Sequence, residues 1–211
     1  MKKTLLMAAL AAAVVGLSFG CGGNPSVSTF KDSRDGKVYK IVQIGSQVWF
    51  AENLNYAAEG SKCYDNKDAN CAKYGRLYDW NTAMKACPVG THLPTDKEWT
   101  ILVDYVGGDS TAGTKLKSSK GWGCENVRFV PEAGTNEYGF SALPGGRGLH
   151  YGKFSTVGNV GIWWSATEDD DGYARCLDMY YYLEGVGWGD YYKTNRFSVR
   201  CVLDNGKERR K

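Results

Sequence analysis

The stretch that decides the fold is HLPTDKEW, residues 92–99 of a chain of 211. Thr95 and Glu98 stand three positions apart, which is the spacing of a capping box, where each side chain binds a backbone amide of the other residue at a helix start. Pro94 stands directly before this start, and apolar residues then recur at helical intervals at Trp99, Leu102, Val103 and Val106. Gly107-Gly108 is a stop signal. The stretch predicts a helix that begins at Thr95 and ends near Val106.

Outward from this helix, the chain predicts a hairpin on one side and short strands on the other. Residues 37–44 alternate apolar and polar side chains, and Gly45-Ser46 separates them from residues 47–50, which is typical of a β-hairpin. A shorter helix is expected over residues 80–85. Later, β-type runs alternate with glycine at residues 140–143, 162–165, 175–182 and 196–202. A hairpin, two helices and a glycine-rich, mostly antiparallel β region indicate an α+β domain over residues 29–204.

The first twenty residues have the order of a secretory signal peptide. A basic start and an apolar run lead to Gly20 and Cys21, and the run is shorter than the roughly 20 apolar residues of a membrane span. Cys21 is the expected lipid-bearing residue, followed by a polar tether over residues 21–28. Because Ser18 stands where a lipoprotein signal usually has leucine, cleavage by ordinary signal peptidase is the alternative. Either route predicts export to the cell envelope, and lipidation predicts an outer-membrane lipoprotein.

The cysteines support export independently. Six remain besides Cys21, and they can pair completely in an oxidising compartment. Although six cysteines allow fifteen pairings, distance along the chain favours three pairs, Cys63 with Cys71, Cys87 with Cys201, and Cys124 with Cys176. Loop-closure entropy predicts a stabilisation of about 2.6 kcal/mol from the shortest loop and about 5 kcal/mol from the longest.

Charge gives little information about partners. The formal net charge is +3, and the tail over residues 205–211 alone carries four basic residues and one acidic residue. The body of the domain is therefore close to neutral. No basic patch with interleaved aromatic residues indicates nucleic-acid binding, and the basic tail is expected to be solvated.

Several spaced motifs carry a resemblance to a known family. They are DGKVYK (35–40), AENLNY (51–56), CYDN (63–66), CAKYGRLY (71–78), HLPT (92–95), YGFSALPGG (138–146), WWS (163–165) and FSVRCV (197–202). In this order they are similar to the Fibrobacter succinogenes major paralogous domain family over about residues 29–204. The resemblance implies a C-type lectin-like fold, a distant likeness to the formylglycine-generating domain that modifies sulfatases, and a fibre-degrading bacterial setting. It also implies a bridge from the first helix to the last strand, in agreement with Cys87 and Cys201.

No set of residues in the sequence forms a convincing active site. Formylglycine generation depends on a closely placed pair of reactive cysteines, and the C-terminal part of the domain offers only Cys176 and Cys201, without close partners. If every cysteine is bridged, no thiolate remains to act as a nucleophile. Ser165 lacks the small-residue elbow of a nucleophilic serine. We therefore expect no catalytic residue.

The histidines and carboxylates are expected to have structural roles. His92 lies at the helix entry and His150 in a surface loop, and neither has metal-ligand spacing with the cysteines. The carboxylates at residues 168–171 lack the ligand spacing of an EF-hand and indicate a solvated turn more than a calcium site. No metal and no cofactor are expected.

The aromatic residues near the C-terminus indicate a binding surface. Tyrosine and tryptophan crowd the region after Tyr173 beyond what alternate inward positions of a strand can bury. Because aromatic faces with a polar edge suit stacking on sugar rings or contacts with proteins, the candidate ligand-binding residues are Tyr180, Tyr181, Tyr182, Trp188, Tyr191 and Tyr192. The tryptophans expected in the core are Trp49, Trp80, Trp99, Trp163 and Trp164.

These features favour a non-catalytic binding or adhesion lipoprotein displayed on the cell envelope. Its expected partners are a polysaccharide or a cell-surface protein, with the membrane reached through the lipid on Cys21. The alternatives are an enzyme related to the formylglycine-generating fold and a purely structural envelope protein.

Overall fold

The structure is a computed structural model that describes residues 28–123 and 134–204. The predicted signal peptide, nearly all of the tether, Cys21, Cys124 and the basic tail therefore lie outside the described residues. Within the described parts, the chain is mixed α and β, and the paired strands are antiparallel. The α+β class predicted from the sequence is confirmed.

A five-stranded sheet joins the two ends of the described chain. Its strands are β1 (Ser28–Lys31), β2 (Val38–Ile44), β3 (Gln47–Phe50), β10 (Val202–Leu203) and β4 (Thr91–His92), in that spatial order. The predicted hairpin is confirmed as β2 and β3, where Ile44 pairs with Gln47. Gly45 in the turn has a φ of 59°, which glycine adopts without strain.

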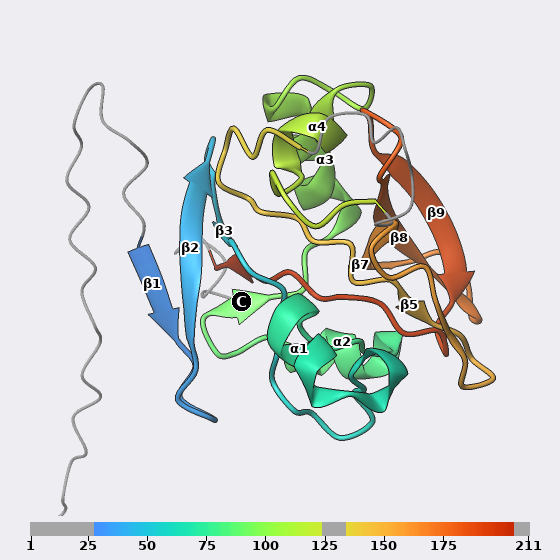
Figure 1. Ribbon diagram of the computed structural model, residues 1–211. Coiled ribbons are helices and arrows are strands. Elements are labelled where there is room, and N and C mark those ends of the chain that lie inside the picture. The colour runs from blue at the N-terminus through green and yellow to red at the C-terminus, as the bar shows by residue number, and fades with distance from the viewer. Residues whose placement is uncertain (1–27, 124–133, 205–211) are drawn as a thin grey trace, which may run out of the picture.

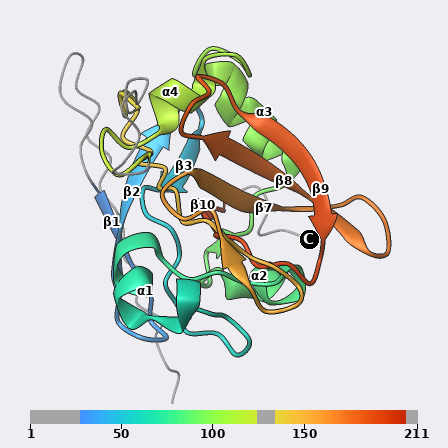
Figure 2. The same cartoon turned by 45° about the vertical axis from the view of Figure 1, so that its right-hand side comes forward.

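A three-stranded sheet lies on the other side of the molecule (Figure 1). It consists of β7 (Val160–Glu168), β8 (Tyr173–Tyr180) and β9 (Gly187–Tyr192). Figure 2 brings this sheet forward and shows β8 between β7 and β9. The strand predicted at residues 162–165 is confirmed as part of β7, and that at 175–182 is confirmed up to Tyr180, where β8 ends and a turn begins. A small hairpin of β5 (Arg147–Gly148) and β6 (Phe154–Ser155) lies beside the sheet.

The two predicted helices are present. The first is α2 (Trp80–Ala86), and the second is α3 (Asp96–Tyr105), which begins with both hydrogen bonds of the capping box between Thr95 and Glu98. Three short elements were not expected, namely η1 (Tyr64–Asn66), α1 (Asp68–Tyr74) and α4 (Ala112–Leu116). In Figure 1, α3 and α4 lie at one end of the molecule, and α1 and α2 at the other.

Two of the predicted strands are wrong in extent. Residues 140–143 form no strand, because Ala142 donates its N–H to the carbonyl of Leu116 and only an isolated bridge joins this segment to Lys117. Residues 196–202 change partner at almost every position, with bridges from Arg196 to Gly148, from Phe197 to Tyr78 and from Ser198 to Trp163. This extended segment runs through the middle of the molecule instead of pairing with one neighbour.

The interior consists of two hydrophobic clusters that share β7. Trp163 belongs to the first cluster, with Trp49, Trp99 and Leu177, and its indole N–H donates to Oδ1 of Asn53 at 2.9 Å. Trp164 belongs to the second, which also contains Tyr78, Phe197 and Cys201. Successive side chains of a strand point to opposite faces, so these adjacent tryptophans, both completely buried, fill different clusters. We call them core one and core two.

Arg200 is a completely buried cation between these clusters. Its guanidinium donates to the carbonyls of Phe50 at 3.0 Å and Phe140 at 2.6 Å, and to Oδ1 of Asn53 at 2.8 Å. Burial lowers the pKa of Arg200 to about 9. The arginine thus binds backbone oxygens of two segments far apart in the chain, and its bond to Asn53 adds a side-chain acceptor from the first of them.

Two of the predicted disulfides are confirmed, Cys63–Cys71 and Cys87–Cys201, with Cα–Cα distances of 4.9 and 5.8 Å. The second connects the end of α2 to the residue before β10. None of the helices among the described residues is long and apolar enough to cross a bilayer.

Candidate functional site

The predicted aromatic group does not form one surface, because strand alternation divides it. Tyr181 and Trp188 pack against core one, while Tyr180 and Tyr191 pack against core two on the opposite face of the sheet. The indole N–H of Trp188 donates to Oδ1 of Asp109 at 3.0 Å. These four side chains are half-buried and contribute to packing, which corrects the expectation that they share a ligand surface.

Tyr182 lies in the turn between β8 and β9 and is 53% exposed. The buried Lys117 fixes this turn, because its ammonium group donates to the carbonyls of Tyr180 at 3.1 Å and Leu183 at 2.6 Å. Burial lowers the pKa of Lys117. The N–H of Thr114 on α4 adds a bond to the carbonyl of Glu184 at 2.7 Å. The turn is therefore anchored to α4.

A continuous row of rings forms at the other end of β8 and β9. Tyr173 pairs with Tyr192 across the strands, with ring centroids 4.5 Å apart. The ring of His150 lies 5.8 Å from Tyr192 and 4.9 Å from Tyr151. Tyr151 and Tyr192 are 60% and 49% exposed. We call these four residues the aromatic row.

The row combines three segments that are distant in the sequence. Strand pairing places Tyr173 opposite Tyr192, and the β5–β6 loop brings the histidine, whose backbone N–H donates to Oδ1 of Asn195 at 3.0 Å. Of its members, the predicted ligand residues included only Tyr192. His150 and Tyr151 between two glycines were the signal for an exposed loop, but no sequence pattern indicated that this loop lies beside Tyr192.

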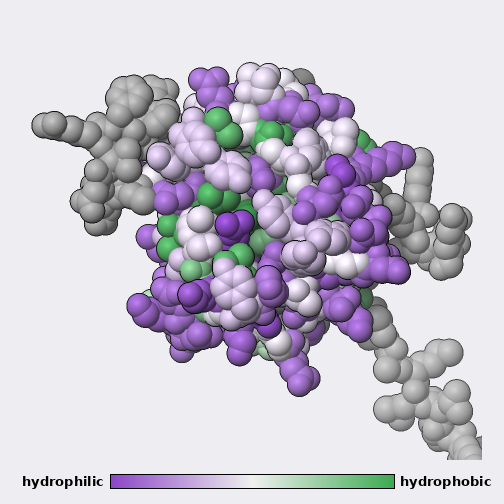
Figure 3. Space-filling view, turned by 90° about the vertical axis from the view of Figure 1, so that its right-hand side faces the viewer, coloured by the Kyte–Doolittle hydropathy of each residue, from purple (hydrophilic) through white to green (hydrophobic). Residues whose placement is uncertain are grey.

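An acidic turn, residues 168–172, borders the row. Oδ1 of Asp170 accepts the N–H groups of Gly172 and Tyr173, both at 2.9 Å. Lys193 donates to the carboxylate of Glu168 and to the carbonyls of Asp170 and Asp171. No group of three or more potential metal-ligating side chains occurs among the described residues. Figure 3 shows this side of the molecule, where pale side chains of intermediate hydropathy and small hydrophobic areas lie within a hydrophilic rim.

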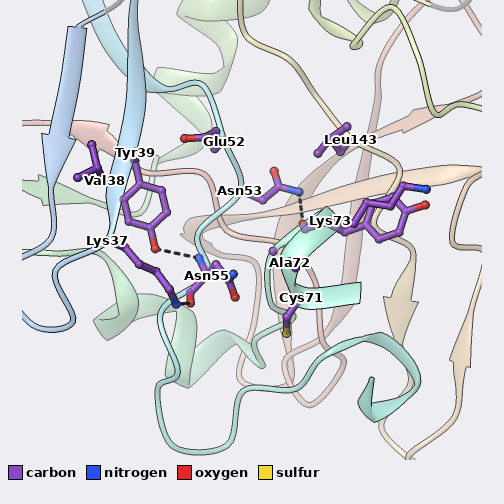
Figure 4. A pocket seen from close by; sticks show the side chains of 12 residues that line it. Lys37, Val38, Tyr39, Glu52, Asn53, Asn55, Cys71, Ala72, Lys73 and Leu143 are labelled. Carbon is purple, nitrogen blue, oxygen red and sulfur yellow. Dashed lines mark hydrogen bonds between the residues drawn. The ribbon is translucent and has the colours of Figure 1, made fainter. Parts of the chain in front are cut away.

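A separate hollow of about 210 Å³ lies between the β2–β3 hairpin and α1 (Figure 4). Its polar groups bind mainly to one another. The N–H of Asn55 donates to the Tyr39 hydroxyl at 3.2 Å, the amide of Asn53 donates to the carbonyl of Tyr74 at 2.9 Å, and the ammonium group of Lys37 donates to the Asn55 carbonyl. The groups drawn in Figure 4 do not form a nucleophile with a neighbouring base.

His92 has the structural position that its place at the helix entry predicts. Its Nε2 lies 2.7 Å from Oε1 of Glu98, and its Nδ1 lies 2.7 Å from Oδ1 of Asp204. The hydrogen bond with Glu98, followed by that with Asp204, raises the pKa of His92 to about 9 against the effect of burial. Burial raises the pKa of Glu98, but the bonds from His92 and Thr95 outweigh it and lower the value overall. Because both of its ring nitrogens are hydrogen-bonded, His92 connects α3 to the end of β10.

The predicted bridge between Cys124 and Cys176 needs correction at Cys176. This residue carries a free, completely buried thiol on β8 and packs in core two. Strand alternation directs its side chain inward, toward Trp164 opposite it on β7. Burial raises the pKa of the Cys176 thiol well above its usual range, so the reactive thiolate is disfavoured. Cys124 lies outside the described residues.

Comparison with known proteins gives one match. The sequence model of the Fibrobacter succinogenes major domain matches residues 42–203. No curated protein matches the chain, and no solved structure does.

Proposed function

The chain belongs to the Fibrobacter succinogenes major domain family, and we propose that this domain is a non-catalytic binding module that holds polysaccharide through its aromatic row. The observation that carries the proposal is the continuous contact of four rings, two of them about half exposed or more, from Tyr151 to Tyr173. Exposed aromatic faces with hydroxyl and imidazole groups can stack on sugar rings and bond to their hydroxyls. The neighbouring acidic turn supplies further acceptors.

The same geometry weighs against the enzyme alternative. A formylglycine-type oxidase needs a reactive thiolate, whereas Cys176 is a completely buried thiol with a raised pKa. The imidazole of His92 is bound at both nitrogens and Ser165 is completely buried. A purely structural envelope protein would not need the exposed row.

The proposal extends to architecture and location. We propose a C-type lectin-like fold, supported by the antiparallel sheets and by the bridge from α2 to the segment before β10. We also propose an exported lipoprotein of the outer membrane, anchored at Cys21. The two disulfides support an oxidising compartment. Metabolic labelling with a radioactive fatty acid is expected to mark the protein but not its Cys21→Ser variant, and labelling of that variant would contradict the anchor.

Retention on insoluble polysaccharide tests the binding function. Tyr151→Ala and Tyr192→Ala should each weaken retention about three- to tenfold, the effect of losing one stacking contact. The matched control is Tyr105→Ala, because Tyr105 is a 57% exposed tyrosine on α3 outside the row. Urea unfolding should show similar stability for the three variants.

Retention that is equal in the row variants and the control would contradict the row as the ligand site, and absence of retention on any glycan would favour the structural alternative. The half-buried Tyr181, Trp188 and Tyr191 are unsuitable for this test. Since each packs against a core cluster, its removal lowers stability as well.

A further inference from the structure

The Cys63–Cys71 disulfide has a cation fixed beside it. Nη1 of Arg76 lies 3.6 Å from Sγ of both cysteines. Ser61 orients the rest of the guanidinium, since its hydroxyl accepts from Nε at 2.8 Å and its carbonyl accepts from Nη2 at 3.2 Å. Arg76 is thereby held with one nitrogen directed at both sulfur atoms.

The guanidinium favours a reduced sulfur more than an oxidised one. A disulfide is a weak acceptor, whereas a thiolate has a full negative charge that a nearby arginine stabilises. The two sulfurs differ, because Oδ1 of Asp68 lies 3.7 Å from Sγ of Cys63. Among the described residues, the polar contacts of the Cys71 sulfur are with Arg76 alone. A thiolate is therefore favoured at Cys71.

We propose that Cys63–Cys71 is a thiol–disulfide exchange site for a dithiol reductant, with Arg76 stabilising the departing Cys71 thiolate. A thiolate of the reductant attacks Sγ of Cys63, the bond to Cys71 breaks, and the electron pair leaves on Cys71, which stays a thiolate beside Arg76. The second thiol of the reductant then attacks the mixed disulfide and releases Cys63, which takes up a proton. Two electrons and one proton pass to the protein, the other proton of the reductant goes to solvent, and the reductant becomes a disulfide.

The Cys87–Cys201 disulfide differs in its loop length and in its charged neighbours. It closes a sequence separation of 114 residues, compared with 8 for Cys63–Cys71, and a disulfide that closes a longer loop stabilises the folded protein more. Among the described residues, no arginine contacts either of its sulfurs, whereas Arg76 contacts both sulfurs of Cys63–Cys71. Cys63 and Cys71 are themselves buried, so loop length and the arginine, not exposure, make Cys63–Cys71 the bridge that we expect to open first.

Opening this bridge affects the hollow between the β2–β3 hairpin and α1. Cys71 lies on α1 and lines the hollow (Figure 4), while Cys63 directly precedes η1. The intervening Asp65 and Asn66 have φ values of 54° and 56°, in the left-handed region that such residues adopt at some cost. Reduction removes the covalent link between η1 and α1. That wall of the hollow is then held in place by hydrogen bonds and no longer by a disulfide. This inference does not depend on polysaccharide binding.

Equilibration in dithiothreitol buffers tests the proposal on the purified protein. Free thiols are first blocked, the protein is equilibrated at graded ratios of reduced to oxidised dithiothreitol, and newly formed thiols are alkylated and mapped by mass spectrometry. Cys63–Cys71 should open at ratios at least about tenfold lower than Cys87–Cys201. Arg76→Gln should require about three- to tenfold more reductant to open Cys63–Cys71, because the guanidinium charge is lost.

The matched control is Arg147→Gln, since Arg147 also donates to a serine hydroxyl, that of Ser155 at 3.2 Å, but does not contact a disulfide. Arg76→Lys, which retains the charge, should fall between Arg76→Gln and the unmodified protein, and circular dichroism verifies folding of each variant. Glutathione, a monothiol, should form its mixed disulfide at Cys63. An unchanged ratio for Arg76→Gln, earlier opening of Cys87–Cys201, or an adduct on Cys71 would overturn the proposal.

Discussion

At the scale of single residues, His92 makes stability depend on pH. Its two carboxylate partners raise its pKa from the ordinary 6.5 to about 9 in the folded protein. The folded state therefore binds a proton more tightly than the unfolded state does. The stabilisation is fully present below pH 6.5 and is lost as pH rises through about 9.

We expect the free energy of unfolding of the unmodified protein to fall, between pH 6 and pH 10, by on the order of 1–3 kcal/mol more than that of His92→Gln. Urea unfolding at the two pH values measures this difference. His150→Gln is the matched control, because His150 is the other histidine of the chain and has no carboxylate contact among the described residues. Parallel pH profiles of the unmodified protein and His92→Gln would contradict the assignment.

The sequence predicted half of this arrangement. Glu98 was identified from the capping box, and the structure adds that one of its oxygens binds Thr95 while the other binds His92. Asp204 could not be identified, because it lies 112 residues after the histidine. Only the pairing of β10 with β4 brings it there.

At the scale of elements, α4 holds the β8–β9 turn by close backbone contact. A β-carbon on Gly113 would lie 2.1 Å from the carbonyl oxygen of Gly185 and 2.6 Å from that of Glu184. Both obstacles are backbone atoms, which cannot move aside without shifting the turn. Position 113 therefore requires glycine, because the backbone of the turn leaves no room for a β-carbon.

Gly113→Ala should lower the free energy of unfolding by about 1–3 kcal/mol, the usual cost of overpacking. It should also speed hydrogen exchange of the amides at residues 184–186. Gly172→Ala is the matched control, since its added β-carbon would meet nothing closer than 3.8 Å. If both variants unfold at the same urea concentration, the contact between α4 and the turn is not required.

The elements that the sequence predicted are those with local signals. The capping box marked α3, and the alternation around Gly45 marked the β2–β3 hairpin. In contrast, α1 lies within an Asp/Asn-rich stretch typical of a turn, and α4 has only five residues, one of them glycine. Tertiary contacts, with the Cys63–Cys71 bridge in the case of α1, determine both helices.

At the scale of the whole molecule, the structure separates most members of the predicted aromatic site. Counting aromatic residues correctly indicated that some reach the surface, as Tyr182 and Tyr192 do. The count could not show that Trp188 and Tyr191 pack against different cores. Nor could it show that a loop from outside the sheet brings His150 beside Tyr192. Predicting both of these facts requires the register of the strands and the position of the loop.

The Cys87–Cys201 disulfide also has a mechanical consequence. Every member of the aromatic row, from His150 to Tyr192, lies inside the covalent loop that this bridge closes. If a bound fibre pulls the row away from an anchor at the N-terminus, the tension enters the chain before Cys87 and passes through the disulfide. The β2–β3 hairpin and α2 can then unravel and lengthen the connection, while inside the loop the disulfide limits extension to the short path between Cys201 and Tyr192. The ligand would stay attached to a folded site while the N-terminal part absorbs the load.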